Sequence, residues 1–431
     1  MRHFLLGICL IMSTSAVFPQ TSVSFENPEN LEPLIQYRLP EWGYDNLWVD
    51  FYLNSHGEKN PNGTTVNSRL QPRYIRYWES EEKIAELDIM LGLESGYVNQ
   101  ADGPSGPDAR PFRGEYDFSG YVYEYFSGDY FALLEGDFWG SSFKDFEREQ
   151  ERDWVVHSKP VIGIGWGRIR NVTPLLRALR FEERYRSLGR EGAFSMDTRH
   201  TMAQLMAQER GFNVVHDRHH KYFWDAFHGQ LPDLQSGLGP FDYFYLDDVL
   251  RENLGNRYEG CDVMLTLDYL VHNTEDDNWD PTGGVSLRGR LFKNLTLEHQ
   301  LGIRGRLHSS FALVDDDRDV STHNMKLNMV LQHLWVLSDR LNLANTMSGG
   351  VPLVEGDVSY QYSEPYIHLG PSDSWVPTEG YIIESSLSYY VEDQVMISAR
   401  ANLRSEVVAS SRKTSWGFNI TGSYSFLSTV Y

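Results

Sequence analysis

The sequence predicts an all-β fold: a transmembrane antiparallel β-barrel of about 14 strands with a helical insertion on the periplasmic side. Three observations lead to this prediction. Long segments in both halves of the chain alternate apolar and polar residues with the two-residue period of a strand. The connections between these segments alternate between short and long. One stretch, residues 171–256, has helical periodicity instead.

The N-terminus has the pattern of a secretion signal. Met1–His3 is a short basic start, Phe4–Met12 is apolar, and Ser13–Ala16 offers small residues for cleavage. The apolar run is too short to span a membrane. We therefore expect residues 1–16 to be a signal peptide. Residues 17–45, rich in Pro, Glu and Asn, should form an extended periplasmic lead-in.

Composition excludes several classes of protein. The net charge of −22 disfavours nucleic acid as a partner. The mature chain would hold one cysteine, Cys261, so an intramolecular disulfide is excluded. No apolar run after the signal is long enough for a transmembrane helix, so the chain could cross a membrane only with strands.

The strands are expected in two parts, residues 46–170 and 257–431. In the first strand, Leu47, Val49, Phe51 and Leu53 share one face. Similar runs follow around Leu87–Leu93, Tyr116–Val122, Val263–Val271, Leu297–Leu307 and Val395–Leu403. Each has an apolar and a charged face and exceeds the usual strand length of about five or six residues. A barrel would turn the apolar face to lipid, whereas a soluble sandwich, the alternative, would bury it against a second sheet.

The lengths of the connections favour the barrel. Five links are short: Glu79–Glu82, Ser127–Asp129, Lys293–Asn294, Ser338–Arg340 and Glu392–Gln394. The links between them are longer: Ser55–Thr65, Gly96–Phe112, Ser141–Arg152, Asn273–Gly283, Val314–Ser321, Ser363–Thr378 and Val408–Lys413. Bacterial barrels have short periplasmic turns and long external loops. The count reaches fourteen, with both termini in the periplasm, if Leu341–Tyr362 is one strand with a kink at Gly349–Pro352.

The end of the chain carries a family resemblance. In Trp416–Phe426, the side chains of Trp416, Phe418, Ile420, Tyr424 and Phe426 share one face. This pattern resembles the closing strand of Gram-negative outer-membrane β-barrel (porin-like) proteins. The resemblance implies an outer-membrane location and recognition of Trp416–Phe426 by the barrel assembly machinery. The chain departs from the family pattern in the tail Leu427–Tyr431, because the family usually stops at the aromatic residue.

The helical insertion replaces one periplasmic turn. Its first helix should begin after Asn171 with Pro174 in the first turn and end near Gly189. Further helices are expected at about Met196–Arg210, with Gly211 after it, Val215–Phe227 and Tyr243–Leu254. Its charged surface and aromatic cluster favour a periplasmic cap. A plug inside the lumen and a helix pair lying on the membrane are the alternatives.

Charged residues on the polar faces of the strands are the candidate site. Acidic side chains come from strands three to seven, and basic ones from strands eight, nine and thirteen. Opposed acidic and basic walls would orient polar solutes in a constriction. Alternatively, the charges pair and fill a closed lumen. The residues predicted to line the pore are Glu86, Asp88, Glu115, Asp117, Asp262, Asp268, Arg288, Arg290, Arg304, Arg306, Arg400 and Arg404.

Other patterns have ordinary interpretations. His216 and His220 have the spacing of a metal pair on one helix, but a solvated or core helix face is the simpler interpretation. Asp315–Asp319 lacks the spacing of a calcium loop and suits a solvated outer loop. The alternating glycines of Gly163–Arg168 fit a curved wall or close packing against the insertion. Cys261 falls on the lipid-facing side of its strand.

The sequence thus predicts an outer-membrane, porin-like channel for small polar solutes with a periplasmic helical module. A structural or export component whose module, residues 172–255, docks a periplasmic protein is the main alternative, and a barrel-embedded envelope enzyme is a third. No nucleophile elbow is present, so we expect no enzyme activity. No catalytic residue, metal or cofactor is expected. Outer-membrane lipid is an expected partner.

Overall fold

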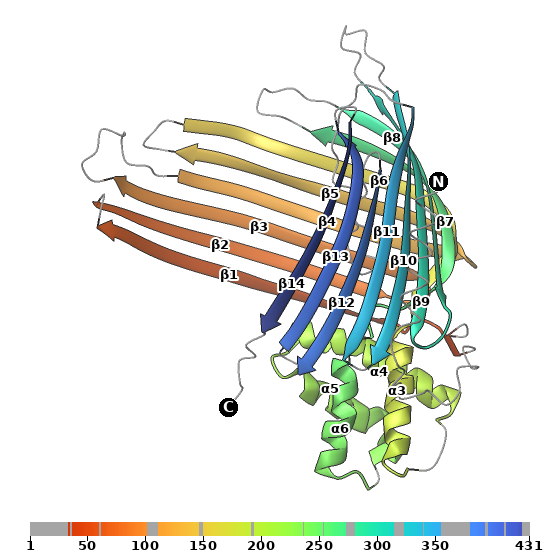
Figure 1. The fold of residues 1–431 in the computed structure, drawn as a ribbon. Coiled ribbons are helices and arrows are strands. Elements are labelled where there is room, and N and C mark those ends of the chain that lie inside the picture. Colours follow the sequence, from red (N-terminus) through yellow and green to blue (C-terminus); the bar gives the residue numbers. More distant parts are fainter. Residues whose placement is uncertain are drawn as a thin grey trace.

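The computed structural model describes residues 33–34, 37–59, 62–100, 111–145, 150–190, 194–235, 237–252, 254–272, 281–313, 323–338, 340–354, 380–392, 395–408 and 411–424. The expected signal peptide, the acidic run Asp315–Asp319 and the tail Leu427–Tyr431 lie outside these residues. Most of the chain forms one curved antiparallel sheet, and helices lie below one end of it (Figure 1).

The sheet has 14 strands in sequence order, each paired antiparallel with the next. The strands before the helices are β1 (Trp42–Lys59), β2 (Asn62–Glu79), β3 (Lys83–Gln100), β4 (Pro111–Ser127), β5 (Tyr130–Asp145) and β6 (Gln150–Asn171). Those after them are β7 (Tyr258–His272), β8 (Thr282–Asn294), β9 (His299–Ala312), β10 (His323–Ser338), β11 (Leu341–Val354), β12 (Gly380–Glu392), β13 (Val395–Val408) and β14 (Ser411–Tyr424). The predicted fold class is confirmed.

The register of the strands aligns their apolar residues. Leu265 is opposite Ile164 on β6 and opposite Leu287 on β8. The row continues through Leu307 and Leu327. Because side chains that face each other across a strand pair share one side of the sheet, this row is a continuous apolar stripe on one face.

The two edge strands, β1 and β14, are not paired with each other in the described part of the chain. In Figure 1 they diverge away from the helical end. The closure that a barrel makes between its first and last strands is therefore not among the strand pairings that the structure describes.

Several predicted connections differ from the observed ones. Ser55–Thr65, expected as a long loop, belongs to β1 and β2, which pair up to Lys59 and Asn62. Alternation continues there, and Thr64, Thr65 and Val66 favour strand. The single strand predicted for Leu341–Tyr362, with a kink at Gly349–Pro352, is described as β11 over Leu341–Val354, with a register shift opposite Met325 and Lys326. Residues beyond Val354, up to 379, lie outside the description.

Helices occupy the connection between β6 and β7, as expected. They are α3 (Thr173–Ser187), α4 (Met196–Val215), α5 (His219–Gln230), the short 3-10 helix η2 (Pro232–Gln235) and α6 (Pro240–Arg251). We call this set the helical module. It lies at the end of the sheet that carries the short turns 80–82, 128–129 and 295–298 (Figure 1). None of the described helices is long and apolar enough to cross a membrane.

Local sequence signals set the ends of these helices. The Asn171 side chain accepts a hydrogen bond from the Thr173 N–H at 3.1 Å. Gly189 follows α3 with a φ of +75°, a conformation that glycine adopts without strain. Ser195 caps α4 by accepting from the Thr198 N–H at 3.1 Å. Gly211 does not end α4, because the helix continues there and packs next to Trp42 of β1.

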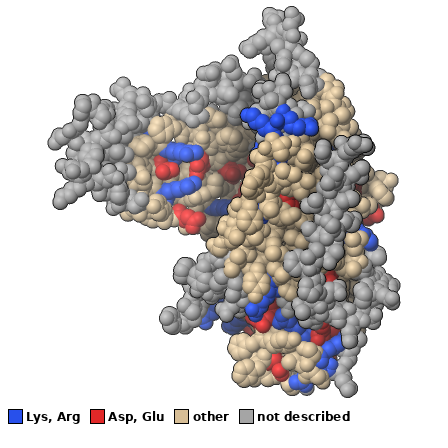
Figure 2. Space-filling view, in the orientation of Figure 1, with Lys and Arg blue, Asp and Glu red and all other residues tan. Residues whose placement is uncertain are grey.

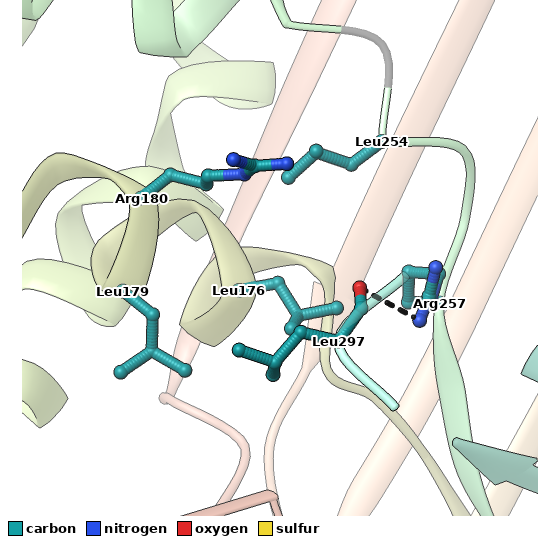
Figure 3. Close-up of a pocket in the computed structure, with 6 residues that line it drawn as sticks. All are labelled: Leu176, Leu179, Arg180, Leu254, Arg257 and Leu297. Carbon is teal, nitrogen blue, oxygen red and sulfur yellow. Dashed lines mark hydrogen bonds between the residues drawn. The ribbon is translucent and has the colours of Figure 1, made fainter. Parts of the chain in front are cut away.

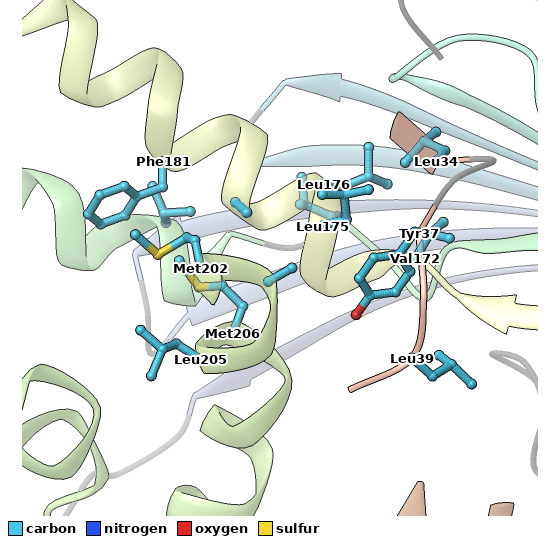
Figure 4. Close-up of a cluster of buried hydrophobic side chains, with 14 of the residues drawn as sticks. Leu34, Tyr37, Leu39, Val172, Leu175, Leu176, Phe181, Met202, Leu205 and Met206 are labelled. Carbon is cyan, nitrogen blue, oxygen red and sulfur yellow. The ribbon is translucent and has the colours of Figure 1, made fainter. Parts of the chain in front are cut away.

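One apolar cluster joins the helical module to the inside of the wall (Figure 4). On the module side it contains Val172, which precedes α3, Leu175 and Phe181 of α3, and Met202 of α4. The described residues of 33–40, here called the N-terminal strap, contribute Leu34, Tyr37 and Leu39 to the same cluster. Strand residues in it are Ile84, Tyr121, Tyr123, Phe131, Leu133, Met264 and Val336. This cluster, the floor, is the buried core that fixes the module under the sheet.

Candidate functional site: the charged inner face and its floor

The two faces of the sheet differ sharply in chemistry. Large apolar side chains on one face are exposed, with Ile164 65% and Phe418 61% accessible. In Figure 2 the visible outside of β10–β14 is mostly uncharged, whereas basic and acidic side chains alternate in the hollow over β1–β5. An apolar face of this extent on strands of 13–22 residues is a lipid-facing surface.

The chain has the fold of an outer-membrane β-barrel. Its wall has the defining arrangement of that class: antiparallel strands long enough to cross the bilayer, apolar residues outside and polar residues inside. Barrels of this kind stand in the outer membrane of Gram-negative bacteria, which is the location that the sequence predicts.

The residues predicted to line the pore all lie on the inner face. Their register connects them across the sheet, for example Asp262 opposite Arg290, and Arg290 opposite Arg304. The other members of the predicted set connect to this face through the same register: Glu86, Asp88, Glu115, Asp117, Asp268, Arg288, Arg306, Arg400 and Arg404.

Toward the β1 edge, the inner charges form ion pairs that remain open to water. The Arg73 Nε donates to Asp88 Oδ1 at 2.9 Å, and Arg69 pairs with Glu115. The Glu86 carboxylate accepts a hydrogen bond from the Tyr121 hydroxyl at 3.1 Å. A polar hollow of about 430 Å³ lies beside these pairs, lined by Asp50, Tyr52, Asn67, Ser68, Arg69, Gln71 and Glu94.

From β5 to β8 several of the inner charges are buried. Arg290 donates from Nε to Asp262 Oδ1 at 2.9 Å, and Arg288 donates from Nη1 to Glu135 at 3.1 Å. Since Glu135 lies on β5 and Arg288 on β8, the second pair spans two intervening strands. Side chains therefore fill the interior in this part of the wall, as the alternative of a filled lumen predicts.

The remaining predicted residues have varied neighbours. Arg306 donates from Nε to the Ser286 hydroxyl at 3.2 Å, and Asp268 lies 3.8 Å from the His308 ring nitrogen. Arg400 forms an ion pair with Glu384 at 3.3 Å. Arg404 lies opposite Ile382, and Asp117 lies opposite Met90 and Trp139.

Glu81, in the short turn between β2 and β3, holds the N-terminal strap against the wall. It accepts a hydrogen bond from the Leu39 N–H at 2.7 Å and two from Arg170, each at 3.0 Å. Arg168 pairs with the same carboxylate. Although burial acts to raise its pKa, the hydrogen bonds from Arg170 and Leu39 and the nearby positive charges lower the pKa of Glu81 below its ordinary value.

Arg257 fixes the other side of the module at the start of β7. Its fully buried guanidinium donates to the Asn294 side chain at 3.0 Å and to the carbonyls of Glu298 at 3.1 Å and Leu297 at 3.1 Å. Figure 3 shows Arg257 and Leu297 beside Leu176 of α3. Burial lowers the pKa of Arg257 to about 10, and the residue stays positively charged at neutral pH.

Buried ion pairs also stabilise the module internally. Glu182 accepts hydrogen bonds from Arg199 at 2.7 and 3.1 Å and from the Phe194 N–H at 3.0 Å. Burial raises the pKa of Glu209 and lowers that of Arg177, while their mutual attraction acts in the opposite direction. These contacts fix the helices relative to one another.

The histidines singled out in the sequence do not share a helix. His216 follows the end of α4, and α5 begins only at His219, because residues 217–218 form a turn. His216 stacks on Tyr222, with ring centroids 3.7 Å apart, and His220 contacts Asp247 at 3.0 Å. Within the described residues no group of three potential ligands could hold a metal ion.

The glycine-rich segment of β6 serves packing. A side chain at Gly165 would overlap the ring of Phe131, and one at Gly163 would overlap Thr266. Gly167 has a φ of +104° and approaches the Cys261 carbonyl, which leaves no room for a side chain. Cys261 itself is exposed, on the outer face that its parity predicts.

Sequence reasoning missed several charged residues of the site. Arg69 and Arg73 on β2 lie next to the acids of β3 and β4, so the predicted separation of acidic and basic walls is interrupted. The alternation of Arg69, Gln71 and Arg73 on one face was a usable signal. The contacts of Glu81 and Arg257 left no periodic signal, because both residues lie outside the strands.

No protein-family model matches the sequence, and the search of curated proteins finds no similar sequence. Solved structures with similar folds include CdiB from Acinetobacter baumannii, at a TM-score of 0.33 and 9% identity over 90% of this chain and 60% of that one. A mutant of the TodX monoaromatic hydrocarbon channel gives 0.30 and 8% over 94% of each chain. OccK5 from Pseudomonas aeruginosa gives 0.28 and 10% over 90% of this chain and 88% of that one.

These similarities are too distant to assign a function. This chain spans 60% of the length of CdiB. Only the TodX structure is named for a solute class, monoaromatic hydrocarbons, and no substrate is carried over from it to this chain.

Proposed function

We propose that the protein is an outer-membrane channel for small polar solutes whose periplasmic end is capped by the helical module. The observation that carries this proposal is the water-exposed ladder of ion pairs on the inner face of β2–β4, beside a polar hollow. Paired charges of both signs can exchange hydrogen bonds with a passing solute without binding it as strongly as isolated charges would.

The module suits a cap because it continues into the floor. Val172 and Leu175 pack with the N-terminal strap against inner residues of the wall. An apolar floor at one end of a polar passage would restrict the flow of water and ions. On this proposal, solutes move past the floor only when the strap or module shifts.

Conductance of the purified full chain in planar bilayers tests the channel. Stepwise currents are expected, and they should grow when the strap is released by Leu39→Asp, which places a charge in the floor. Ile397→Asn, on the exposed outer face of β13, is the matched control for a polar substitution. A protein that inserts fully but passes no current, with or without the strap substitution, would rule out the channel.

A second candidate function is docking of a periplasmic protein by the module. It is favoured by Phe241 and Phe244 of α6, which are 86% and 71% exposed. Two unpartnered aromatic side chains on one helix are typical of an interaction site. A photo-crosslinking residue at position 241 should then capture one envelope protein in cells, and Phe244→Ser should abolish the capture. If Phe244→Ser abolishes the capture but leaves the conductance unchanged, docking by the module is a function distinct from that of the channel.

A further inference from the structure

Four polar side chains interrupt the apolar outer face where β9, β10, β11 and β12 approach the short turns. They are His299, His333, Asn345 and Ser385, one from each strand. The register places His333 opposite Leu301 and Asn345, and Asn345 opposite Ser385. All four therefore lie on the side of the sheet that carries the lipid-facing row, not on the charged inner face.

These side chains form a hydrogen-bonded chain. The Ser385 hydroxyl donates to Asn345 Oδ1 at 2.8 Å, and the Asn345 amide nitrogen lies 3.4 Å from His333 Nδ1. His333 Nε2 lies 3.2 Å from His299 Nδ1. Each residue contacts the next, and the chain ends at His299.

With the Asn345 amide nitrogen turned toward His333, the direction of the chain sets the tautomers of both histidines. Because the Asn345 amide can only donate from its nitrogen, His333 Nδ1 must accept. His333 then carries its proton on Nε2 and donates it to His299 Nδ1, which leaves the proton of His299 on Nε2. The chain therefore ends in an N–H donor for which the described residues offer no partner.

The position of this donor corresponds to the headgroup level of a bilayer. Trp335 lies near the end of β10 and stacks on His299, with ring centroids 5.0 Å apart. Trp166 and Tyr389, also close to strand ends on this side, have half-exposed outer side chains. Aromatic girdles at this level mark the membrane–water boundary of barrels.

The positive charge of Arg257 lies close to His299. Arg257 donates to the carbonyl of Glu298, the residue that precedes His299. Arg257 is fully buried, and its guanidinium donates to the Asn294 side chain and to backbone carbonyls. The carboxylates of Glu298 and Glu259 are also close enough to interact with its charge.

We propose that this chain of side chains binds the phosphate of a phospholipid headgroup in the bilayer leaflet next to the short turns. The His299 Nε2–H donates to a phosphate oxygen, and the Trp335 ring contacts the glycerol region. His333, Asn345 and Ser385 are positioning residues that hold the imidazole tautomer. The proposal rests on the lipid-facing outer wall and not on the channel, so it stands or fails separately from the proposed function.

Native mass spectrometry of the full chain released from detergent tests the site. The probes are phosphatidylglycerol and a diacylglycerol with the same acyl chains but no phosphate. The wild type should retain phosphatidylglycerol in preference to diacylglycerol. His299→Phe keeps a ring against Trp335 but removes the donor, and it should weaken retention roughly tenfold, the effect of one hydrogen bond to a charged group.

Two further variants make this test decisive. His299→Gln keeps an N–H and should largely restore retention. Ile303→Phe, on the same face of β9, adds a ring elsewhere and should leave retention unchanged. The proposal would be overturned if the wild type retained the two lipids equally, or if His299→Phe retained phosphatidylglycerol as well as the wild type does. It would also be overturned if inorganic phosphate displaced the bound lipid as strongly as added lipid does, or if a dimer of the chain appeared in place of the lipid-bound monomer.

Discussion

Two parts of the inner face carry the same kinds of ion pair in different surroundings. Beside β1, Arg73 and Asp88 are 41% and 23% exposed, whereas on β7 and β8 Arg290 and Asp262 are 6% and 1% exposed. Water screens the first pair and solvates either charge alone. The second pair has lost that water, so each charge depends on the other.

The exposed and the buried ion pairs therefore have different roles in the interior. The exposed pairs suit a surface that a solute passes, because they exchange with water at little free-energy cost. The buried pairs hold the wall together over the floor, where Tyr123 lies against Arg290 with the guanidinium 5.7 Å from the ring centroid. Substitutions in the two parts should therefore differ in their effect on stability.

The largest effect is expected at Asp262. Asp262→Ala leaves the buried Arg290 guanidinium without its carboxylate, and should destabilise the folded barrel by about 3–5 kcal/mol. Urea unfolding in lipid vesicles, followed by tryptophan fluorescence, measures this change.

A double variant is the matched control. Asp262→Leu combined with Arg290→Met replaces the pair by apolar side chains and should recover most of the lost stability, since a buried pair itself contributes little net free energy. If Asp262→Ala unfolds at the same urea concentration as the wild type, the two parts of the inner face do not differ as described.

An intermediate effect is expected at Glu81, which is partly buried under the strap. Glu81→Gln should weaken the hold of Arg170 and Leu39 and cost roughly 1–3 kcal/mol, the scale of hydrogen bonds to a charged group. Protease cleavage within residues 33–40 should become faster. Glu82→Gln, at the exposed neighbour in the same turn, is the control and should have no effect.

The same residue predicts a pH dependence. The pKa of Glu81 in the folded protein lies below its ordinary value of 4.5. Its contribution to stability is therefore complete above that value and is lost as the pH falls through the lowered folded pKa. Cleavage of the strap should accelerate over this acidic range in the wild type and not in Glu81→Gln. A strap equally protected at acidic and neutral pH would contradict the role of Glu81.

Sequence reasoning found the faces of the wall because alternation is a local property. Asp262 and Arg404, 142 positions apart by their numbers, were placed on one face from their own neighbours alone. The helices were also located within a few residues, apart from α4, whose glycine packs against β1 instead of ending the helix.

Partners could not be predicted in the same way, because they depend on register and curvature. Nothing near Glu135 in the sequence indicates that Arg288 contacts it across two strands. The outward chain from His299 to Ser385 needs four strands in register before its side chains meet. Each of these residues alone appears as a single polar exception on an apolar face.

The smallest effect on stability, and the most informative about function, is expected at Arg73. Arg73→Gln removes one member of an exposed pair and should change the free energy of unfolding by about 0–1 kcal/mol. Asp88 then faces the passage without its arginine, so the channel should favour cations more than the wild type does. The reversal potential in a salt gradient measures this shift.

The opposite substitution sharpens the same comparison. Asp88→Asn leaves Arg73 unbalanced and should shift the reversal potential toward anions, again with little loss of stability. The buried counterpart Arg290→Gln should instead destabilise the barrel, because Asp262 keeps its charge without water or arginine. Arg73→Gln and Arg290→Gln could instead change ion selectivity equally and the free energy of unfolding equally. In that case burial would not distinguish the exposed ion pairs from the buried ones, and the passage would not be confined to the side of the interior next to β1.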